Sequence, residues 1–145
     1  MTDDAGHRTA PSAGALYPLE LYLATAAGVD HFDPARHVLT RVSDGDPRSA
    51  LHDAALAQSA VLEAPVVFVI AAVYARTAGK YGPRAERYVH LEAGHAAQNI
   101  VLQAVALGLA SVPIGDFDDE RVQAALGLPP DQQPLYLIPV GQRRA

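Results

Sequence analysis

The sequence contains no cysteine, which excludes a disulfide, a thiolate metal site and a cysteine nucleophile. It has no uninterrupted apolar run of the ~18 residues that a membrane-spanning helix requires. Its opening residues, MTDDAGHRTA, lack the basic region followed by an apolar region that marks a secretory signal peptide. These absences predict a soluble, cytoplasmic protein that does not associate with a membrane.

Positive charge is also scarce. The chain has 11 Lys and Arg residues against 16 Asp and Glu, a formal net charge of −5 at pH 7, and its charges are scattered. This balance disfavours bulk nucleic-acid binding. There is no Walker motif and no Gly-x-Gly-x-x-Gly, so any phosphate contact falls to isolated arginines. The candidates are Arg8, Arg143 and Arg144, each of which could equally be a solvated surface charge.

Enough apolar material is present for a core, because 50% of the 145 residues are hydrophobic. The length suits one domain over residues 1–145. Alternation, turn residues and caps predict strands at 19–25, 66–74 and 134–142, a hairpin over 31–46, helices at 46–65, 85–107 and 118–127, and a loop at 75–86. The sum is a mixed α+β fold with helices flanking a central sheet of about four or five strands.

The predicted helix over residues 85–107 is the longest element, and its apolar residues nearly circle its axis. The residues that interrupt them are His90, Glu92, His95, Gln98, Asn99 and Gln103. A helix that is apolar on all sides is enclosed on all sides. In a chain this small, we expect a second subunit to supply part of that enclosure.

Metal and serine chemistry are both weakly supported. Glu92 and His95 could share a helix face, but a di-metal bundle needs two such pairs and the sequence has one. We therefore predict no metal. Ser12 lacks the full Gly-x-Ser-x-Gly pattern and precedes a strand, so a loop serine that bonds its own backbone is favoured over a nucleophile.

Two other loops carry chemical candidates. Lys80 and Tyr81 could move a proton if burial and charge brought a pKa toward neutrality, or they could form an exposed turn. Further along, Gly115 and Asp116 offer backbone N–H groups just before a helix start, which suits an electron-rich acceptor. The same segment could be a plain strand-to-helix connection.

Four blocks of sequence resemble one family in family order: RTAPSAGALYPLELY, KYGPRAERYVHLEAGHAAQN, ALGLASVPIGDFDD and PLYLIPVG. They look like the SagB-type dehydrogenases, a branch of the nitroreductase-like FMN flavoproteins. The resemblance runs from about Arg8 to Gly141. It implies an α+β sandwich that forms a homodimer, with FMN held at the subunit interface.

The resemblance also implies roles for particular residues. The small residues ahead of the first strand would let the flat flavin ring approach the backbone, and the second loop would border its reactive side near N5. The implied flavin-lining residues are Pro11, Ser12, Ala13, Gly14, Pro113, Ile114, Gly115 and Asp116. Lys80 and Tyr81 match a Lys-Tyr pair associated with catalysis in azoline-oxidising members.

Family members usually carry a preceding segment with an Arg-Arg-Ser type site for the FMN phosphate. In this sequence we expect that contact from Arg8 and from Arg143 or Arg144, whose planar guanidinium groups suit phosphate oxygens.

The function implied is that of an FMN-dependent oxidoreductase, most specifically an azoline dehydrogenase acting on a modified peptide alongside peptide-modifying partner enzymes. The alternatives are an NAD(P)H-dependent nitro or quinone reductase and a flavin-free scaffold subunit.

Overall fold

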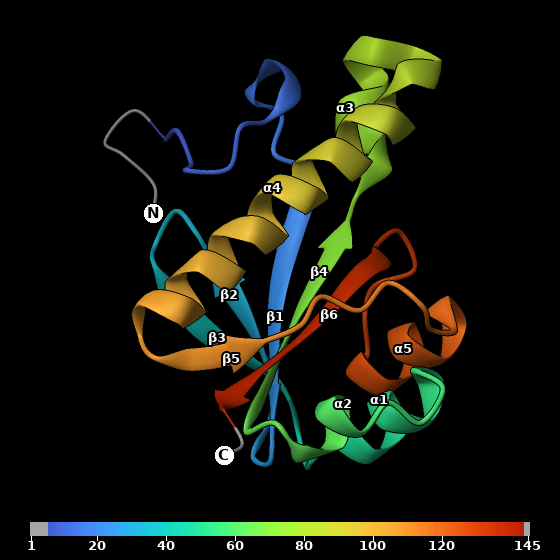
Figure 1. Ribbon diagram of the computed structural model, residues 1–145. Coiled ribbons are helices and arrows are strands. Elements are labelled where there is room, and N and C mark those ends of the chain that lie inside the picture. The colour runs from blue at the N-terminus through green and yellow to red at the C-terminus, as the bar shows by residue number, and fades with distance from the viewer. Residues whose placement is uncertain (1–5, 144–145) are drawn as a thin grey trace.

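A computed structural model describes residues 6–143 and contains a six-stranded antiparallel sheet (Figure 1). The strand order is β3-β2-β1-β4-β6-β5. The strands are β1 (Leu19–Thr25), β2 (Gly28–Asp33), β3 (Val38–Asp44), β4 (Val66–Ala72), β5 (Leu109–Ser111) and β6 (Gln133–Gln142). The predicted α+β class is confirmed. The sheet has six strands rather than four or five, because residues Leu109–Ser111, just after the long helix, pair with β6 as a short edge strand.

Helices cover both faces of this sheet. They are α1 (Arg48–Ala54), α2 (Ser59–Glu63), α3 (Tyr74–Tyr81), α4 (Ala85–Ala106) and α5 (Asp119–Leu126), with short 3-10 turns at Ala13–Ala15 and Gly82–Arg84. The long helix α4 crosses one face, and α1, α2 and α5 cover the other (Figure 1).

Strand β4 shows how the sheet divides the core. Val67, Val69 and Ala71 join the cluster beneath α1, α2 and α5. Phe68 and Ile70 pack in the cluster beneath α4. Because successive side chains of a strand point to opposite faces, this alternation makes β4 a central strand with cover on both sides, as predicted.

The α4 face is less completely covered than the other. A groove of about 790 Å³ runs between α4 and the sheet, and most of its lining is apolar. Leu102 and Val105 of α4, and Leu107 just beyond it, are more than half exposed. The described part of the chain therefore does not enclose α4 by itself.

The helix predicted over residues 46–65 is wrong as a single element, because α1 and α2 are separate. The break lies at Leu56 and Ala57, which both have positive φ angles, of 54° and 60°. A left-handed φ angle ends a right-handed helix, so α1 cannot continue through these two residues. Leu51 of α1 and Val61 of α2 are both fully buried in the same core cluster.

The loop predicted over residues 75–86 is also wrong, because it contains α3. Gly79 and several cations give this segment the composition of an exposed loop, so the helix was not predicted. Tyr74, Ala78 and Tyr81 recur at the spacing of one helix face, but the helix is short and the residue it buries is Thr77, so the pattern is weak evidence for a helix. Gly82, with a φ angle of 53°, follows its last residue and turns the chain toward α4.

Candidate functional site

The opening loop ahead of β1 folds back on itself around Ser12. The Ser12 hydroxyl accepts a hydrogen bond from the Tyr17 N–H at 3.0 Å, and its carbonyl accepts one from the Ala15 N–H at 3.1 Å. Gly14 lies between them with a φ angle of 63°, where a side chain is disfavoured. The hydroxyl thus bonds the local backbone, which was the favoured interpretation of this serine.

Polar residues of α4 hold this loop from one side. His95 lies with its Nδ1 3.4 Å from the Pro11 carbonyl oxygen, and the Asn99 side-chain amide donates to Thr9 Oγ1 at 3.3 Å. Glu92, one turn earlier in α4, is buried. Because these α4 residues are spaced by three and four, they share one helix face. Two of the polar interruptions in the long helix, His95 and Asn99, therefore contact the opening loop.

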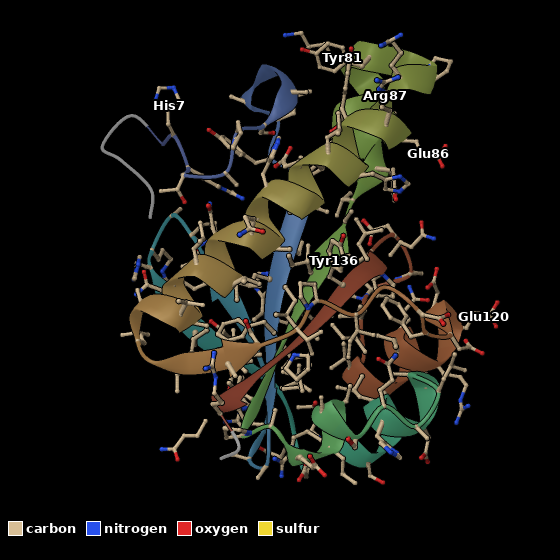
Figure 2. All side chains as sticks on the ribbon, viewed as in Figure 1. His7, Tyr81, Glu86, Arg87, Glu120 and Tyr136 are labelled. Atoms are coloured by element: carbon tan, nitrogen blue, oxygen red, sulfur yellow. The ribbon has the colours of Figure 1, made fainter. Side chains whose placement is uncertain are left out.

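The structure brings Lys80 and Tyr81 onto the Ser12–Gly14 turn. A β-carbon placed on Gly14 would lie 2.9 Å from the Tyr81 hydroxyl and 3.1 Å from Lys80 Nζ. Figure 2 shows Tyr81 at the tip formed by α3 and the start of α4. Its ring packs edge-on against Tyr88, with the centroids 5.0 Å apart. Two candidate groups far apart in the sequence thus form one cluster.

The candidate phosphate-binding arginines do not lie together. The Arg8 guanidinium is 4.4 Å from the centre of the Tyr17 ring, beside the opening loop. Leu19 at the start of β1 pairs with Ala72, which pairs with Gln133 at the start of β6. Arg143 follows the other end of β6 and is exposed, so it lies at the opposite end of the sheet. The third candidate, Arg144, lies outside the described residues.

The second loop, residues 112–118, is held by the sheet. Ile114 is buried and exchanges two backbone hydrogen bonds with Leu137, of 2.8 and 3.0 Å. Proline has no N–H and the Ile114 N–H is engaged, so neither Pro113 nor Ile114 can donate a backbone hydrogen bond to a ligand. The N–H groups of Gly115 and Asp116 have no acceptor among residues 6–143, and they are the donors left for a ligand.

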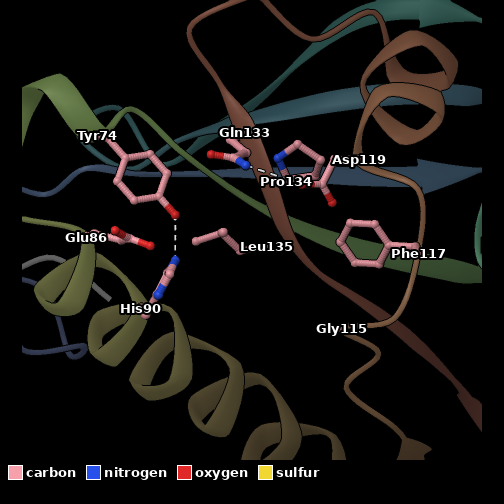
Figure 3. A pocket seen from close by; sticks show the side chains of 9 residues that line it. All are labelled: Tyr74, Glu86, His90, Gly115, Phe117, Asp119, Gln133, Pro134 and Leu135. Carbon is pink, nitrogen blue, oxygen red and sulfur yellow. Dashed lines mark hydrogen bonds between the residues drawn. The ribbon is translucent and has the colours of Figure 1, made fainter.

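A hollow of about 390 Å³ adjoins Gly115 (Figure 3). Its other lining residues are Tyr74, Glu86, His90, Phe117, Asp119, Gln133, Pro134 and Leu135. The Tyr74 hydroxyl lies 2.7 Å from His90 Nε2. Burial raises the Tyr74 pKa, and the charges of Glu86 and Asp119 raise it further. Sequence reasoning missed Tyr74 because it assigned that residue to the end of a strand, and it noted His90 only as a polar interruption.

The two glycine loops line different hollows. Arg8 and Thr9 of the opening loop line the large groove beneath α4, whereas Gly115 lines the smaller hollow with His90. Glu92 lies two positions after His90 in α4, about 200° further around the helix axis, so the two side chains are on nearly opposite sides of the helix. One described chain therefore places α4 between its two candidate flavin loops.

Residues 6–143 lack two features. No helix there is both long and apolar enough to cross a membrane. Within the same residues, no three side chains of His, Asp or Glu gather closely enough to hold a metal ion.

The model of the nitroreductase family matches residues 2–142. A protein of Methanocaldococcus jannaschii, provisionally named a nitroreductase, is 43% identical over 99% of this chain and 74% of its own length. A crystal structure from Anabaena variabilis, described in the same provisional way, has a TM-score of 0.88 and 29% identity over 97% of this chain.

A third similar structure is a chain of the Escherichia coli microcin synthetase McbBCD complex with truncated pro-MccB17 bound. Its TM-score is 0.86, with 25% identity over 96% of this chain. This chain spans 57% of that protein's length and 31% of the Anabaena variabilis chain.

Proposed function

The chain belongs to the nitroreductase family, and we propose that it is an FMN-dependent oxidoreductase that oxidises azoline rings in a modified peptide. The observation that carries this proposal is the contact between the Ser12–Gly14 turn and the Lys80–Tyr81 pair. The turn is suited to a flat ring, and the pair is suited to moving a proton beside it. Both come from separate parts of the sequence and lie within contact of each other.

The residues of both loops fit a planar cofactor. The free N–H groups of Gly115 and Asp116 are suitable donors, and the hollow beside Gly115 falls within the roughly 300–1,000 Å³ typical of ligand pockets. A β-carbon on Gly115 would meet no atom closer than the Tyr136 ring at 3.8 Å, so space is open there. We assign Pro11–Gly14 and Pro113–Asp116 to the ring, and Arg8 or Arg143 to the phosphate.

When bound, FMN would supply the two-electron acceptor that takes up a hydride. The chain's own residues would move the proton and orient the ring. Lys80 or Tyr81 would remove a proton from the azoline ring, which loses one hydride and one proton and becomes an aromatic azole. The Gly115 and Asp116 N–H groups would fix the ring orientation. The bound pro-MccB17 in the similar microcin synthetase complex supports a peptide substrate and partner enzymes.

A second copy of this chain would complete the site. The two loops lie on opposite sides of α4, so one cofactor can meet both only if they come from different chains. The exposed Leu102, Val105 and Leu107 and the adjacent apolar groove offer the surface for such a homodimer.

Replacing Lys80 tests the proton-transfer role. Lys80→Ala should lower azoline-peptide turnover by about 100-fold or more while the yellow FMN stays bound, because the lysine serves the reaction rather than the fold. Turnover is followed by mass loss of the peptide, and bound FMN by absorbance. Arg87→Ala removes a nearby exposed cation and is the matched control. Unchanged turnover in the Lys80 variant would remove the pair from the mechanism.

An NAD(P)H-dependent nitro or quinone reductase is the second candidate, favoured by the name of the Methanocaldococcus jannaschii relative. The described residues that line the hollow beside Gly115 include two carboxylates, Glu86 and Asp119, and neither Lys nor Arg. Such a lining repels the phosphates of a dinucleotide. Stopped-flow mixing separates the candidates: bleaching of the flavin by NAD(P)H favours the reductase, and bleaching only by an azoline peptide favours the dehydrogenase.

A further inference from the structure

Arg76 joins the first turn of α3 to the opening loop. One terminal nitrogen of its guanidinium donates to the Tyr17 carbonyl oxygen at 3.1 Å. The other donates to Glu20 Oε1 at 2.5 Å. A guanidinium can serve two acceptors at once because its donors are held in a planar fork. Arg76 thus ties α3 both to the end of the opening loop and to β1.

Glu20 is held in place to receive Arg76. Its side chain is only 12% exposed, and its other carboxylate oxygen lies 2.6 Å from Nε2 of His31 on β2. Burying a carboxylate is costly unless neighbouring groups compensate it, and Arg76 and His31 do so from two sides. The acceptor that orients Arg76 is therefore anchored on the sheet.

Tyr17 has a backbone conformation that needs support. Its φ angle of 47° lies in the left-handed region, which a residue with a side chain adopts only where surrounding contacts enforce it. Its N–H donates to Ser12 Oγ at 3.0 Å, and its carbonyl accepts from Arg76. The turn therefore holds one side of this peptide backbone, and α3 holds the other.

The face of α3 that carries Arg76 also carries Lys80. The two residues are four apart in α3, a spacing that places side chains on one face of a helix. At one end of this face Arg76 meets Tyr17. At the other end, a β-carbon on Gly14 would lie 3.1 Å from Lys80 Nζ. The opening loop is thus contacted near both ends of the helix.

We propose that Arg76 is a positioning residue, whose bridge to Tyr17 and Glu20 holds the Lys80 face of α3 against the Ser12–Gly14 turn. The part that concerns the turn depends on these contacts alone. The part that concerns turnover rests on the proposed function. Arg76 takes no part in the bond changes of the reaction, because its guanidinium is engaged with the chain itself.

The first measurement is amide hydrogen exchange at Tyr17 in the absence of FMN. Arg76→Ala should speed this exchange by about tenfold or more, because hydrogen bonds from charged groups are among the strong ones and their loss lets the turn open locally. The variant should fold, since α3 keeps the hydrogen bond between Tyr74 and His90 of α4. Arg87→Ala removes an exposed arginine near the start of α4 (Figure 2) and is the matched control, which should exchange like wild type.

Glu20 provides an independent variant. Glu20→Ala removes the carboxylate that orients Arg76 and should speed Tyr17 exchange by about threefold, as expected for a partly exposed ion pair. The double variant should exchange no faster than Arg76→Ala alone, because Glu20 reaches Tyr17 through Arg76. Glu20→Ala by itself keeps the test valid if Arg76→Ala does not fold.

The second measurement is azoline-peptide turnover at saturating FMN. Arg76→Ala should lower kcat by about tenfold or more and change KM by no more than about twofold, because Lys80 is displaced while no peptide-binding group is removed. Arg76→Ala combined with Lys80→Ala should turn over no more slowly than Lys80→Ala alone, since Arg76 acts through Lys80. A residue that only stabilised the fold would lower turnover in both backgrounds alike.

Three results would overturn the assignment: Tyr17 exchange in Arg76→Ala that matches Arg87→Ala, Tyr17 exchange that speeds further when Glu20→Ala is added to Arg76→Ala, or turnover losses of Arg76→Ala and Lys80→Ala that multiply. If the wild type takes up no FMN while Tyr17 exchange follows the expected pattern, the proposed function fails and the role of Arg76 in holding the turn stands.

Discussion

The two glycine loops of this protein are held by different kinds of contact. Side chains hold the opening loop, through hydrogen bonds that reach it from His95 and Asn99 of α4. Backbone hydrogen bonds hold the second loop, through the bridge between Ile114 and Leu137. The first loop can therefore be loosened by a single polar substitution. The second can be loosened only by disturbing the sheet and the core beneath it.

Paired substitutions should expose this difference in stability. Leu137 is fully buried, so Leu137→Ala should lower the free energy of unfolding by about 2–5 kcal/mol. Ser12→Ala removes one hydrogen-bonding hydroxyl at the surface of α4 and should cost only about 0.5–1.5 kcal/mol. Urea unfolding followed by circular dichroism measures both. Equal losses would mean that the two loops are anchored alike.

The glycines themselves give a second comparison. Gly14→Ala places a methyl group at a positive φ angle, 2.9 Å from the Tyr81 hydroxyl, so the pair must move and turnover should fall about tenfold or more. The added methyl group of Gly115→Ala meets only ordinary contacts, so the free energy of unfolding of this variant should lie within about 0.5 kcal/mol of the wild-type value.

FMN affinity separates steric blocking from misfolding in these variants. Gly115→Ala should bind FMN more weakly despite its normal stability, because its methyl group takes the space assigned to the ring. Wild-type affinity in this variant would show that the second loop does not contact the cofactor.

The smallest effect concerns pH. Burial raises the Glu92 pKa above its ordinary value of 4.5, so the folded chain holds that proton more tightly than the unfolded chain. Wild-type stability should therefore fall, relative to Glu92→Gln, as pH rises from about 4.5 through the raised pKa. Both proteins keep Arg8 and His95, the charged groups that face Glu92. Urea unfolding at about pH 5 and about pH 8 measures the difference, which should be larger at the higher pH.

Local signals made much of the fold predictable. The bounds of β1 match the prediction, and α5 begins at its predicted cap, where Asp118 accepts a hydrogen bond from the Arg121 N–H. Gly127 ends that helix in the left-handed conformation. Each of these features is determined by residues close together in the sequence.

Features set by distant contacts were not predictable. The break between α1 and α2 falls at Leu56 and Ala57, where no glycine or proline marks it in the sequence. The helix α3 is too short for its apolar spacing to stand out from a loop rich in Gly and cations. The polar residues of α4 were visible in the sequence, but their partners were not, because Pro11 and His95 are 84 residues apart. The pairing of Tyr74 with His90 was hidden for the same reason.

Complementation between two variants tests the central claim, a cofactor shared by two chains, most directly. Gly14→Ala and Gly115→Ala chains with different tags are coexpressed, and FMN is added at a concentration that saturates wild type but not either variant. If the chains pair at random, about half of the dimers contain one chain of each variant, and one of the two sites in such a dimer has both loops intact. FMN binding should therefore recover to about a quarter of wild type. Binding no greater than that of either variant alone, or a wild type that takes up no FMN, would contradict the account.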